Sequence, residues 1–561
     1  MENDKEHVKK ILLLLFKRSG DLFLLANIVQ QLQNLNQNQN KYKDIHIDLL
    51  IYDEFLSAAS IIPHIHKIHF LERKTIISLK ENPLFNWAWG LNNFLENLQE
   101  CLDTSWDEVY NFSYGVVETY ISNALQTKKI SGPILLENGK IAFSNKNCCY
   151  FNENKSNLVQ SSVHLLDFYK SEISHFYPAA LHKSISNSME KFTGLVSQEN
   201  ELECSLYFKN LRRKLHLNDI PVYIIGIQLS ASNLEKQIDI NIMQELLYFI
   251  LEDKRLFPLL ILAPSATDHQ LANELNKVFN NKLISIDCDF KALSSVITRI
   301  DFLLTPDTAI KHLANWVHCK QLEIHKNADF VQLHGSKCVN DLILYPKNST
   351  DSLCAKDLYK ILLYGLKLIQ QTSFKINENW VLLENVGNNP FIFYWPIQNS
   401  FGVQETLQQY IEKLFYYQFN FGKINKAPYT PYLQQLDKTA FFLFLQNEKK
   451  ELISIVNNLL ELLKEIRKFK LNKSMDPSLF LQNLQKLLDP SVKGANLCVN
   501  IPLSILQYNM EGLPAQVFPY QIDKLENVLF DFKNNLNIFT HILELMSLVH
   551  LQEGIKLNAK I

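Results

Sequence analysis

Short apolar runs alternate with longer amphipathic stretches in the first part of the chain. This alternation is typical of βαβ units, in which buried parallel strands are continuously apolar. The first unit is predicted from an apolar run at Ile11–Phe16, a turn at Ser19–Gly20 and a helix from Leu22 to about Leu35. Further strands are predicted at 45–52, 67–71 and 108–111, and helical stretches at 88–102 and 114–125. The pattern favours a parallel, Rossmann-like sheet.

The same alternation restarts near Pro221. It predicts strands at 222–228, 259–263, 283–286 and 302–305. Between and after them it predicts helices at 240–253, 268–279, 290–300 and from about 307 to 317. A second doubly wound sheet follows from this pattern.

The pattern changes again after about Gln370. An aromatic stretch at Phe391–Trp395 precedes long amphipathic segments at Lys438–Lys470 and Asp523–Leu551. We therefore predict an α/β protein of three parts: Rossmann-like domains at residues 1–185 and 186–370, and a mainly helical extension of unknown role at 371–561. The aromatic stretch either binds an acceptor or partner or covers a core face, which is the more frequent use of such residues.

Composition and charge argue against several classes of protein. Lys and Arg number 56 and Asp and Glu 58, for a net charge of −2, which argues against nucleic acid as a partner. The nine cysteines follow no disulfide framework spacing, as expected in a reducing compartment. The run Ile11–Phe16 is too short to span a membrane, and no targeting segment is evident. These observations predict a cytoplasmic protein.

The segment from Thr305 to Ala314 (TPDTAIKHLA) carries the clearest chemical signal. It follows a predicted strand and opens a helix, and Asp307 or Thr308 is a good N-terminal capping residue. A helix that begins at the carboxyl end of a parallel strand is also where a diphosphate binds, on free backbone amides. His312, one turn in, adds a further donor. The alternative from the residues alone is an ordinary capped helix with a packed histidine.

This segment resembles the signature of glycosyltransferase family 9, the ADP-heptose:lipopolysaccharide heptosyltransferases. The pattern D-[ST]-[GA]-x-x-H-[LI]-A is matched at every fixed position, by Asp307, Thr308, Ala309, His312, Leu313 and Ala314. In that family the segment binds the diphosphate of the donor. The resemblance therefore implies the same role for Asp307, Thr308, Ala309 and His312.

Three other segments are similar to the family in the same order. Gly20-Asp21 matches a turn after the first strand, although Lys17 and Arg18 replace the family's usual serines. Residues 106–113 resemble the family's third-strand region, and residues 225–232 with Lys236 resemble the start of its second domain, with Ser230 in place of a glycine. The resemblance thereby implies donor-side roles for Gln228, Ser232 and Lys236, and acceptor-side roles for Gly20, Asn111 and Ser113.

The resemblance implies a B-type glycosyltransferase fold, with an acceptor-side and a nucleotide-sugar-binding Rossmann-like domain facing a cleft. It implies an inverting, metal-independent transfer without a cofactor, from a donor such as ADP-heptose. Asp21 would be the general base; the alternative is a carboxylate that stabilises a helix N-terminus. The acceptor would be lipopolysaccharide, another glycan or a protein. One place for the transfer would be the inner face of the membrane. The rival interpretations are a non-catalytic interaction module and a transferase that uses a UDP- or GDP-sugar.

Two sets of residues superficially suggest a metal site. On a strand His64 and His66 would share one face and His69 the other, which suits no compact site. Cys319, Cys338 and Cys354 lie near His318, His325 and His334 but contain no C-x₂-C pair. Buried thiols are the more frequent explanation of such cysteines.

Overall fold

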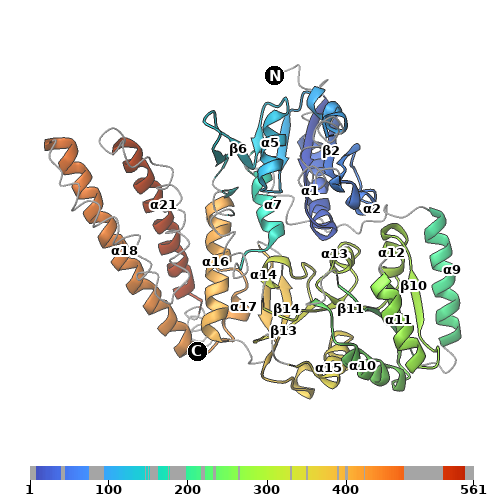
Figure 1. Cartoon of the computed structure of the whole chain (residues 1–561). Coiled ribbons are helices and arrows are strands. Elements are labelled where there is room, and N and C mark those ends of the chain that lie inside the picture. The colour runs from blue at the N-terminus through green and yellow to red at the C-terminus, as the bar shows by residue number, and fades with distance from the viewer. Residues whose placement is uncertain are drawn as a thin grey trace. The chain divides into compact units, whose positions relative to one another are not determined.

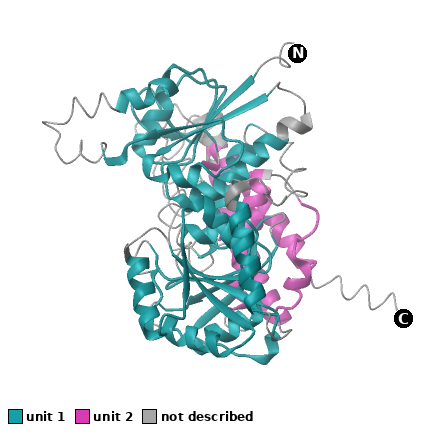
Figure 2. Cartoon of the chain, turned by 90° about the vertical axis from the view of Figure 1, so that its right-hand side faces the viewer, with its two compact units in different colours: residues 1–145, 164–400 teal, residues 146–163, 401–561 magenta. Residues whose placement is uncertain are grey.

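The computed structural model describes most of the chain. The described residues are 8–39, 44–74, 94–145, 147–148, 151, 162–174, 176, 198–215, 221–231, 236–262, 266–328, 331–348, 352–387, 391–397, 402–421, 424–472 and 522–549. The chain divides into two compact units, residues 1–145 with 164–400 and residues 146–163 with 401–561 (Figure 2). The first unit contains both large sheets, and the second is helical.

The first sheet, which includes the strand labelled β2 in Figure 1, is parallel throughout, in the order β3-β2-β1-β4-β5. Its strands are β1 (Val8–Leu14), β2 (Asp44–Tyr52), β3 (Lys67–Leu71), β4 (Glu108–Asn111) and β5 (Ile130–Ser131). Strand β1 is central, and its second half, residues 11–14, is apolar and fully buried, as expected of a strand covered on both faces. The strand order reverses between β1 and β4. In open α/β sheets, ligands bind outside the carboxyl ends of the strands at such a reversal.

The second sheet has eight strands, in the order β10-β9-β8-β11-β12-β13-β14-β15. The strands are β8 (Tyr223–Gln228), β9 (Leu256–Leu262), β10 (Ile284–Asp287), β11 (Phe302–Pro306), β12 (Gln321–Ile324), β13 (Leu342–Pro346), β14 (Trp380–Gly387) and β15 (Phe393–Pro396). Strands β8 to β13 are parallel, and β14 and β15 add antiparallel edges. A hairpin of β6 (Pro133–Leu135) and β7 (Ile141–Phe143) forms a separate small sheet.

Helices cover the two sheets and connect them. The first unit contains α1 (Ser19–Gln39), α2 (Leu56–Ala59), α5 (Val116–Ala124), α7 (Leu165–Ser174), α9 (Gln198–Leu215), α10 (Ile240–Glu252), α11 (Ala266–Val278), α12 (Phe290–Ile297), α13 (Ala309–Trp316), α14 (Val331–His334) and α15 (Ala355–Gly365). The α10 and α15 helices pack together over the core of the second sheet. The α1 helix, which follows β1, packs directly against α13, which follows β11. Each sheet thus contributes the helix after a central strand to one shared contact.

The second unit is built on α16 (Val403–Phe421), α17 (Thr430–Leu433), α18 (Lys438–Asn472) and α21 (Ile522–Ser547). The three long helices contact one another in every pairing, and their amphipathic sequences bury apolar side chains between them. No described helix combines the length and the apolar composition that a membrane span requires.

The predicted α/β fold with two Rossmann-like sheets and a helical extension is confirmed. The extension begins later than expected, because β14 and β15 continue the second sheet past the predicted boundary at residue 370. The boundary predicted at residue 185 lies outside the described residues. The aromatic stretch at Phe391–Trp395 is used in the sheet and core, since Phe391 to Tyr394 are buried in and beside β15. The predicted turn at Ser19–Gly20 is wrong: both residues belong to the first turn of α1.

Candidate active site

The diphosphate-type turn forms where the sequence predicts it, between β11 and α13. Thr308 is the N-cap residue of α13, but its side chain does not cap the helix. Its hydroxyl donates instead to Gln228 Oε1 at 2.7 Å, and the Thr305 hydroxyl donates to the same oxygen at 2.7 Å. Gln228, at the end of β8, is buried. Gln228 therefore links the ends of β8 and β11 beneath the helix N-terminus. Because the Thr308 hydroxyl bonds to Gln228, it does not cap the first-turn amides of α13.

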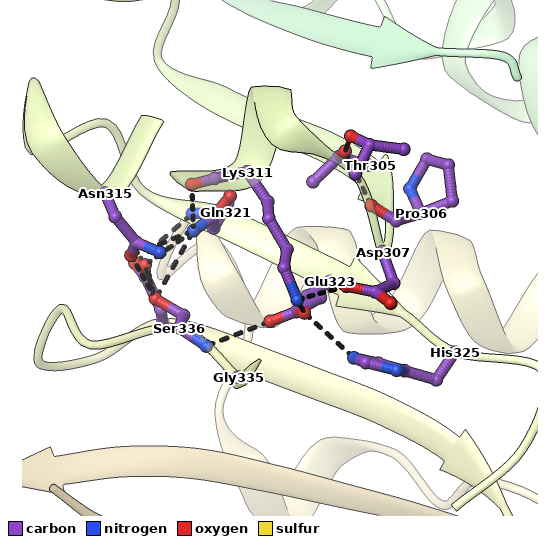
Figure 3. Close-up of polar contacts among 12 residues, drawn as sticks. Thr305, Pro306, Asp307, Lys311, Asn315, Gln321, Glu323, His325, Gly335 and Ser336 are labelled. Carbon is purple, nitrogen blue, oxygen red and sulfur yellow. Dashed lines mark hydrogen bonds and ion pairs between the residues drawn. The ribbon is translucent and has the colours of Figure 1, made fainter. Parts of the chain in front are cut away.

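Asp307, beside this turn, is held by two lysines. Its carboxylate pairs with Lys236 and with Lys311, one turn further along the chain. Lys311 also pairs with Glu323 on β12, and the side chains of Lys311 and Glu323 are fully buried. Figure 3 shows the Lys311 ammonium between the two carboxylates. On the far side His325 Nε2 lies 2.9 Å from Glu323 Oε1.

The charges of this network hold one another in the ionised state. Burial alone would raise the pKa of Asp307, but the charges of Lys311, His325 and Lys236 hold it well below its usual value. The pKa of Glu323 is lowered in the same way, with burial opposed by Lys311 and His325. Burial would lower the pKa of Lys311, and the two carboxylates raise it. The network therefore contains two lysine cations balanced by two carboxylates.

Gly20 marks the place where α1 meets α13. A Cβ atom on Gly20 would lie 2.7 Å from His312 Cδ2 and 3.6 Å from Ala309 Cα. A glycine is thus needed here because the His312 ring occupies the space of a side chain. The contact brings the first turn of α1, which also contains Asp21, against α13. The helices that carry the predicted base and the predicted donor-binding motif therefore pack against each other.

His312 itself is buried, and its Nδ1 atom has no hydrogen-bond partner among the described residues. Burial lowers the pKa of His312 well below its usual value, and the charges of Lys311 and His334 lower it further. The imidazole is therefore neutral near pH 7, with one nitrogen that donates and one that accepts. It can offer a hydrogen bond to a phosphate oxygen but no formal charge.

A second histidine at this site received no role from the sequence. Burial lowers the pKa of His334, at the end of α14, to about 4, against the opposing effect of the charges of Asp21 and then Asp307. His334 is therefore neutral near pH 7 in the folded protein. Asp21 is buried, and its backbone N–H donates to Arg18 O at 3.0 Å, as expected in a first helical turn.

The predicted acceptor-side residues are bonded within the protein. Asn111 Nδ2 donates to Ser122 Oγ at 3.3 Å, and Asn111 Oδ1 accepts from the Ser113 backbone N–H at 3.0 Å. The Ser113 hydroxyl accepts from the Phe16 N–H at 2.8 Å. These bonds fasten the carboxyl end of β4 to that of β1, so any contact with an acceptor stays a prediction. Ser232 lies outside the described residues.

The histidine and cysteine sets are placed differently from their predicted arrangement. His64 lies before β3 with φ 62°, and His66 and His69 both contact Asp48, at 3.1 and 2.9 Å. The expectation that His66 and His69 point to opposite sides is therefore wrong. Within the described residues, no group of three or more His, Cys, Asp or Glu side chains is placed to hold a metal ion.

The three cysteines do not share one environment. Cys319 and Cys338 are buried, and Cys354 is exposed at the N-cap of α15. Cys338 Sγ donates to Asn315 O at 3.1 Å and lies 3.8 Å from His318 Nδ1.

A second buried polar cluster lies behind the lysine network. Ser336 joins the two, since its N–H donates to Glu323 Oε2 at 2.9 Å and its hydroxyl donates to Asp341. Asp341 also accepts from Gln321 Nε2 at 3.2 Å. Burial raises the pKa of Asp341 to about 7, against these hydrogen bonds. Asp341 is thus largely protonated in the folded protein at mildly acidic pH.

Replacement of Asp341 by asparagine is expected to change how stability depends on pH. With a folded pKa of about 7, against 3.8 as the usual value, the parent loses stability as the pH rises from 4 to 7. The asparagine variant lacks this loss. The difference in unfolding free energy, variant minus parent, should therefore increase by up to about 4 kcal/mol between pH 4 and pH 7. Denaturant unfolding at pH 4.5, 6 and 7.5 measures it. Asp301→Asn, at a carboxylate 3.0 Å from Arg212, is the control. A difference that stays constant with pH would contradict the assignment.

Glu323 and Lys311, like His334, are residues of this site that the sequence did not predict. Lys311 stands at a variable position of the motif, and Glu323 lies in a four-residue strand in which every residue is buried. The available signal was the Glu itself, because a carboxylate inside a short buried strand requires a cation nearby.

Comparisons with known proteins return solved structures only; no protein-family model and no curated protein matches the chain. A glycosyltransferase family 9 protein from Veillonella parvula has 14% identity and a TM-score of 0.43, over 66% of this chain and 96% of that one. The E. coli heptosyltransferase WaaC with ADP has 13% identity and a TM-score of 0.43, over 64% and 99%. Anabaena Alr3699/HepE with UDP and glucose has 12% and 0.31, over 65% and 91%. Similarity at this level identifies neither a family nor a donor for this chain.

Proposed function

We propose that this chain is an inverting glycosyltransferase that moves a heptose, or a related sugar, from an ADP-sugar to a lipopolysaccharide, glycan or protein acceptor. The observation that supports it most is the contact between the first turns of α1 and α13. There Gly20, the residue before Asp21, leaves room for the His312 ring of the proposed donor-binding motif. A base next to an anion-binding helix N-terminus is what sugar transfer from a nucleoside diphosphate needs.

In the proposed reaction the acceptor hydroxyl attacks the anomeric carbon of the donor. Asp21 removes the hydroxyl proton as the new C–O bond forms. The bond between the anomeric carbon and the diphosphate oxygen breaks, and the nucleoside diphosphate leaves with the bonding electrons. The anomeric configuration inverts because attack and departure occur on opposite faces of the sugar.

The departing diphosphate develops negative charge, which the first turn of α13 is placed to stabilise. Its backbone amides and helix dipole supply positive potential, and Thr308 does not cap them. Lys236 supplies a cation at the same point, and His312 a neutral hydrogen-bond donor. We expect the diphosphate to compete with Asp307 for Lys236, since Lys236 is partly exposed whereas Lys311 is fully buried.

One observation favours a second candidate function, a non-catalytic interaction module. Both lysines beside the motif already have a carboxylate partner, Asp307. A protein that had lost its donor would keep this pair as internal structure. A UDP- or GDP-sugar as the donor is a further alternative, because no adenine-specific contact can be assigned to any described residue.

The test is a panel of nucleotide sugars that includes ADP-heptose, incubated with purified protein with and without cell-envelope extract. We expect release of free nucleotide from one donor, dependent on the extract and lost in Asp307→Ala. Release from a UDP- or GDP-sugar alone would correct the donor. No release from any donor by well-folded protein would favour the interaction module instead.

A further inference from the structure

Tyr169, on α7, is a buried tyrosine whose hydroxyl is unpaired. Its side chain is 2% exposed, and its Oη atom has no hydrogen-bond partner in the described part of the chain. Other buried tyrosines do have partners: Tyr110 Oη donates to Glu108 at 3.0 Å, and Tyr394 Oη donates to Ser336 O at 3.0 Å. A buried hydroxyl without a partner is costly to the folded protein. Such a group needs an explanation, and a bound ligand or a catalytic role is one that can be tested.

The position of Tyr169 indicates what kind of ligand its hydroxyl would bind. Its ring packs on Phe112, with 4.8 Å between the ring centroids. Phe112 directly follows β4, and its N–H donates to Leu14 O at the end of β1 at 3.0 Å. Tyr169 therefore lies at the carboxyl ends of β1 and β4, where the strand order of the first sheet reverses. This is where open parallel sheets bind ligands.

Asp21 belongs to the same place. The α7 helix packs against α1, whose first turn contains Asp21. Burial raises the pKa of Tyr169 well above its usual value, and the negative charge of Asp21 raises it further. The phenol therefore keeps its proton and acts as a hydrogen-bond donor near a carboxylate that accepts. A sugar hydroxyl group fits such a pair, because it can donate to one partner and accept from the other.

We propose that Tyr169 binds a hydroxyl group of the acceptor beside Asp21 and so positions the attacking sugar. This inference rests on the proposed glycosyltransferase function, and it adds a residue on α7 to the acceptor side of the site. Tyr169 touches the acceptor in this scheme, whereas Asp21 takes the proton.

Tyr169→Phe tests the proposal, since it removes only the hydroxyl. We expect kcat/KM for the acceptor to fall about 10- to 100-fold, because the acceptor loses a buried hydrogen bond. The affinity for the donor, and the slow hydrolysis of the donor without acceptor, should not change. The unfolding midpoint should stay the same or rise, because no bond within the protein is lost.

Tyr110→Phe is the matched control. It removes a buried hydroxyl that is paired with Glu108, so the unfolding midpoint should fall while kcat/KM for the acceptor stays unchanged. If the parent transfers sugar and Tyr169→Phe transfers it equally well, the role of Tyr169 is wrong and the proposed function stands. A fall in the Tyr169→Phe midpoint as large as that of the control would also overturn it. If the folded parent transfers from no donor, the proposed function fails and this inference with it.

Discussion

Asp21→Asn is expected to lower kcat for sugar transfer about 10²- to 10⁴-fold, the range that general-base catalysis contributes. Asparagine keeps the size of the side chain but cannot take the proton from the acceptor hydroxyl. Because the proposed partner of Asp21 is the acceptor hydroxyl and not the donor diphosphate, the donor Kd should change little. Steady-state transfer rates with a saturating acceptor, together with calorimetric donor binding, measure both quantities.

The alternative role of Asp21 is stabilisation of the α1 N-terminus by a carboxylate, which is worth about 0.3–1 kcal/mol. Asp357 provides the matched control, since it lies in the first turn of α15 and is the only acidic residue of that turn. Asp357→Asn should cost a similar small amount of stability and leave transfer unchanged. Near-normal turnover in Asp21→Asn, with donor binding intact, would reduce Asp21 to the same structural role.

The strands that follow a simple rule were predictable. β8 and β11 have the predicted bounds to within one residue because short apolar runs between polar segments indicate buried strands. The α13 turn was also placed correctly, because Pro, Asp, Thr and Ala after an apolar strand are local signals for a helix start. β12 and β13 were not predicted. Gln321 and Glu323 interrupt the apolar pattern of β12, since they serve the buried polar clusters rather than the core.

The parts of the site that depend on packing between the sheets could not be predicted. A lysine in a helix normally indicates the solvent face, so no local pattern predicts that Lys311 is buried. In the structure seven of the eight residues of α13 are buried, because α1 covers the side that would otherwise face solvent. The need for a glycine at position 20 also comes from the packing of α1 against α13. It could not be predicted from the local sequence, because the His312 ring that excludes a side chain there lies almost three hundred residues later in the chain.

Lys311→Met is expected to be among the most destabilising single substitutions at this site. The methionine fills similar space but removes the cation that Asp307 and Glu323 share. Asp307 keeps Lys236, whereas Glu323 keeps only His325 and the Ser336 N–H, so the Glu323 charge is left poorly compensated in the interior. Loss of one partner of a buried ion pair costs about 3–5 kcal/mol. Denaturant unfolding at pH 7.5 measures this cost.

Two measurements distinguish the uncompensated charge of Glu323 from a packing defect as the cause of this loss of stability. Without Lys311 the folded-state pKa of Glu323 should lie above its unfolded value, so the variant should recover stability as the pH falls towards 5. Adding Glu323→Gln to Lys311→Met should also recover part of the loss, because the uncompensated charge is gone. Lys360→Met is the control, since Lys360 is paired with Asp357 at 3.3 Å on α15 with both side chains partly exposed, and pairs open to solvent contribute about 1 kcal/mol or less. A double variant less stable than Lys311→Met at pH 7.5 would show that the methionine disturbs packing and that the shared charge is not what Lys311 provides.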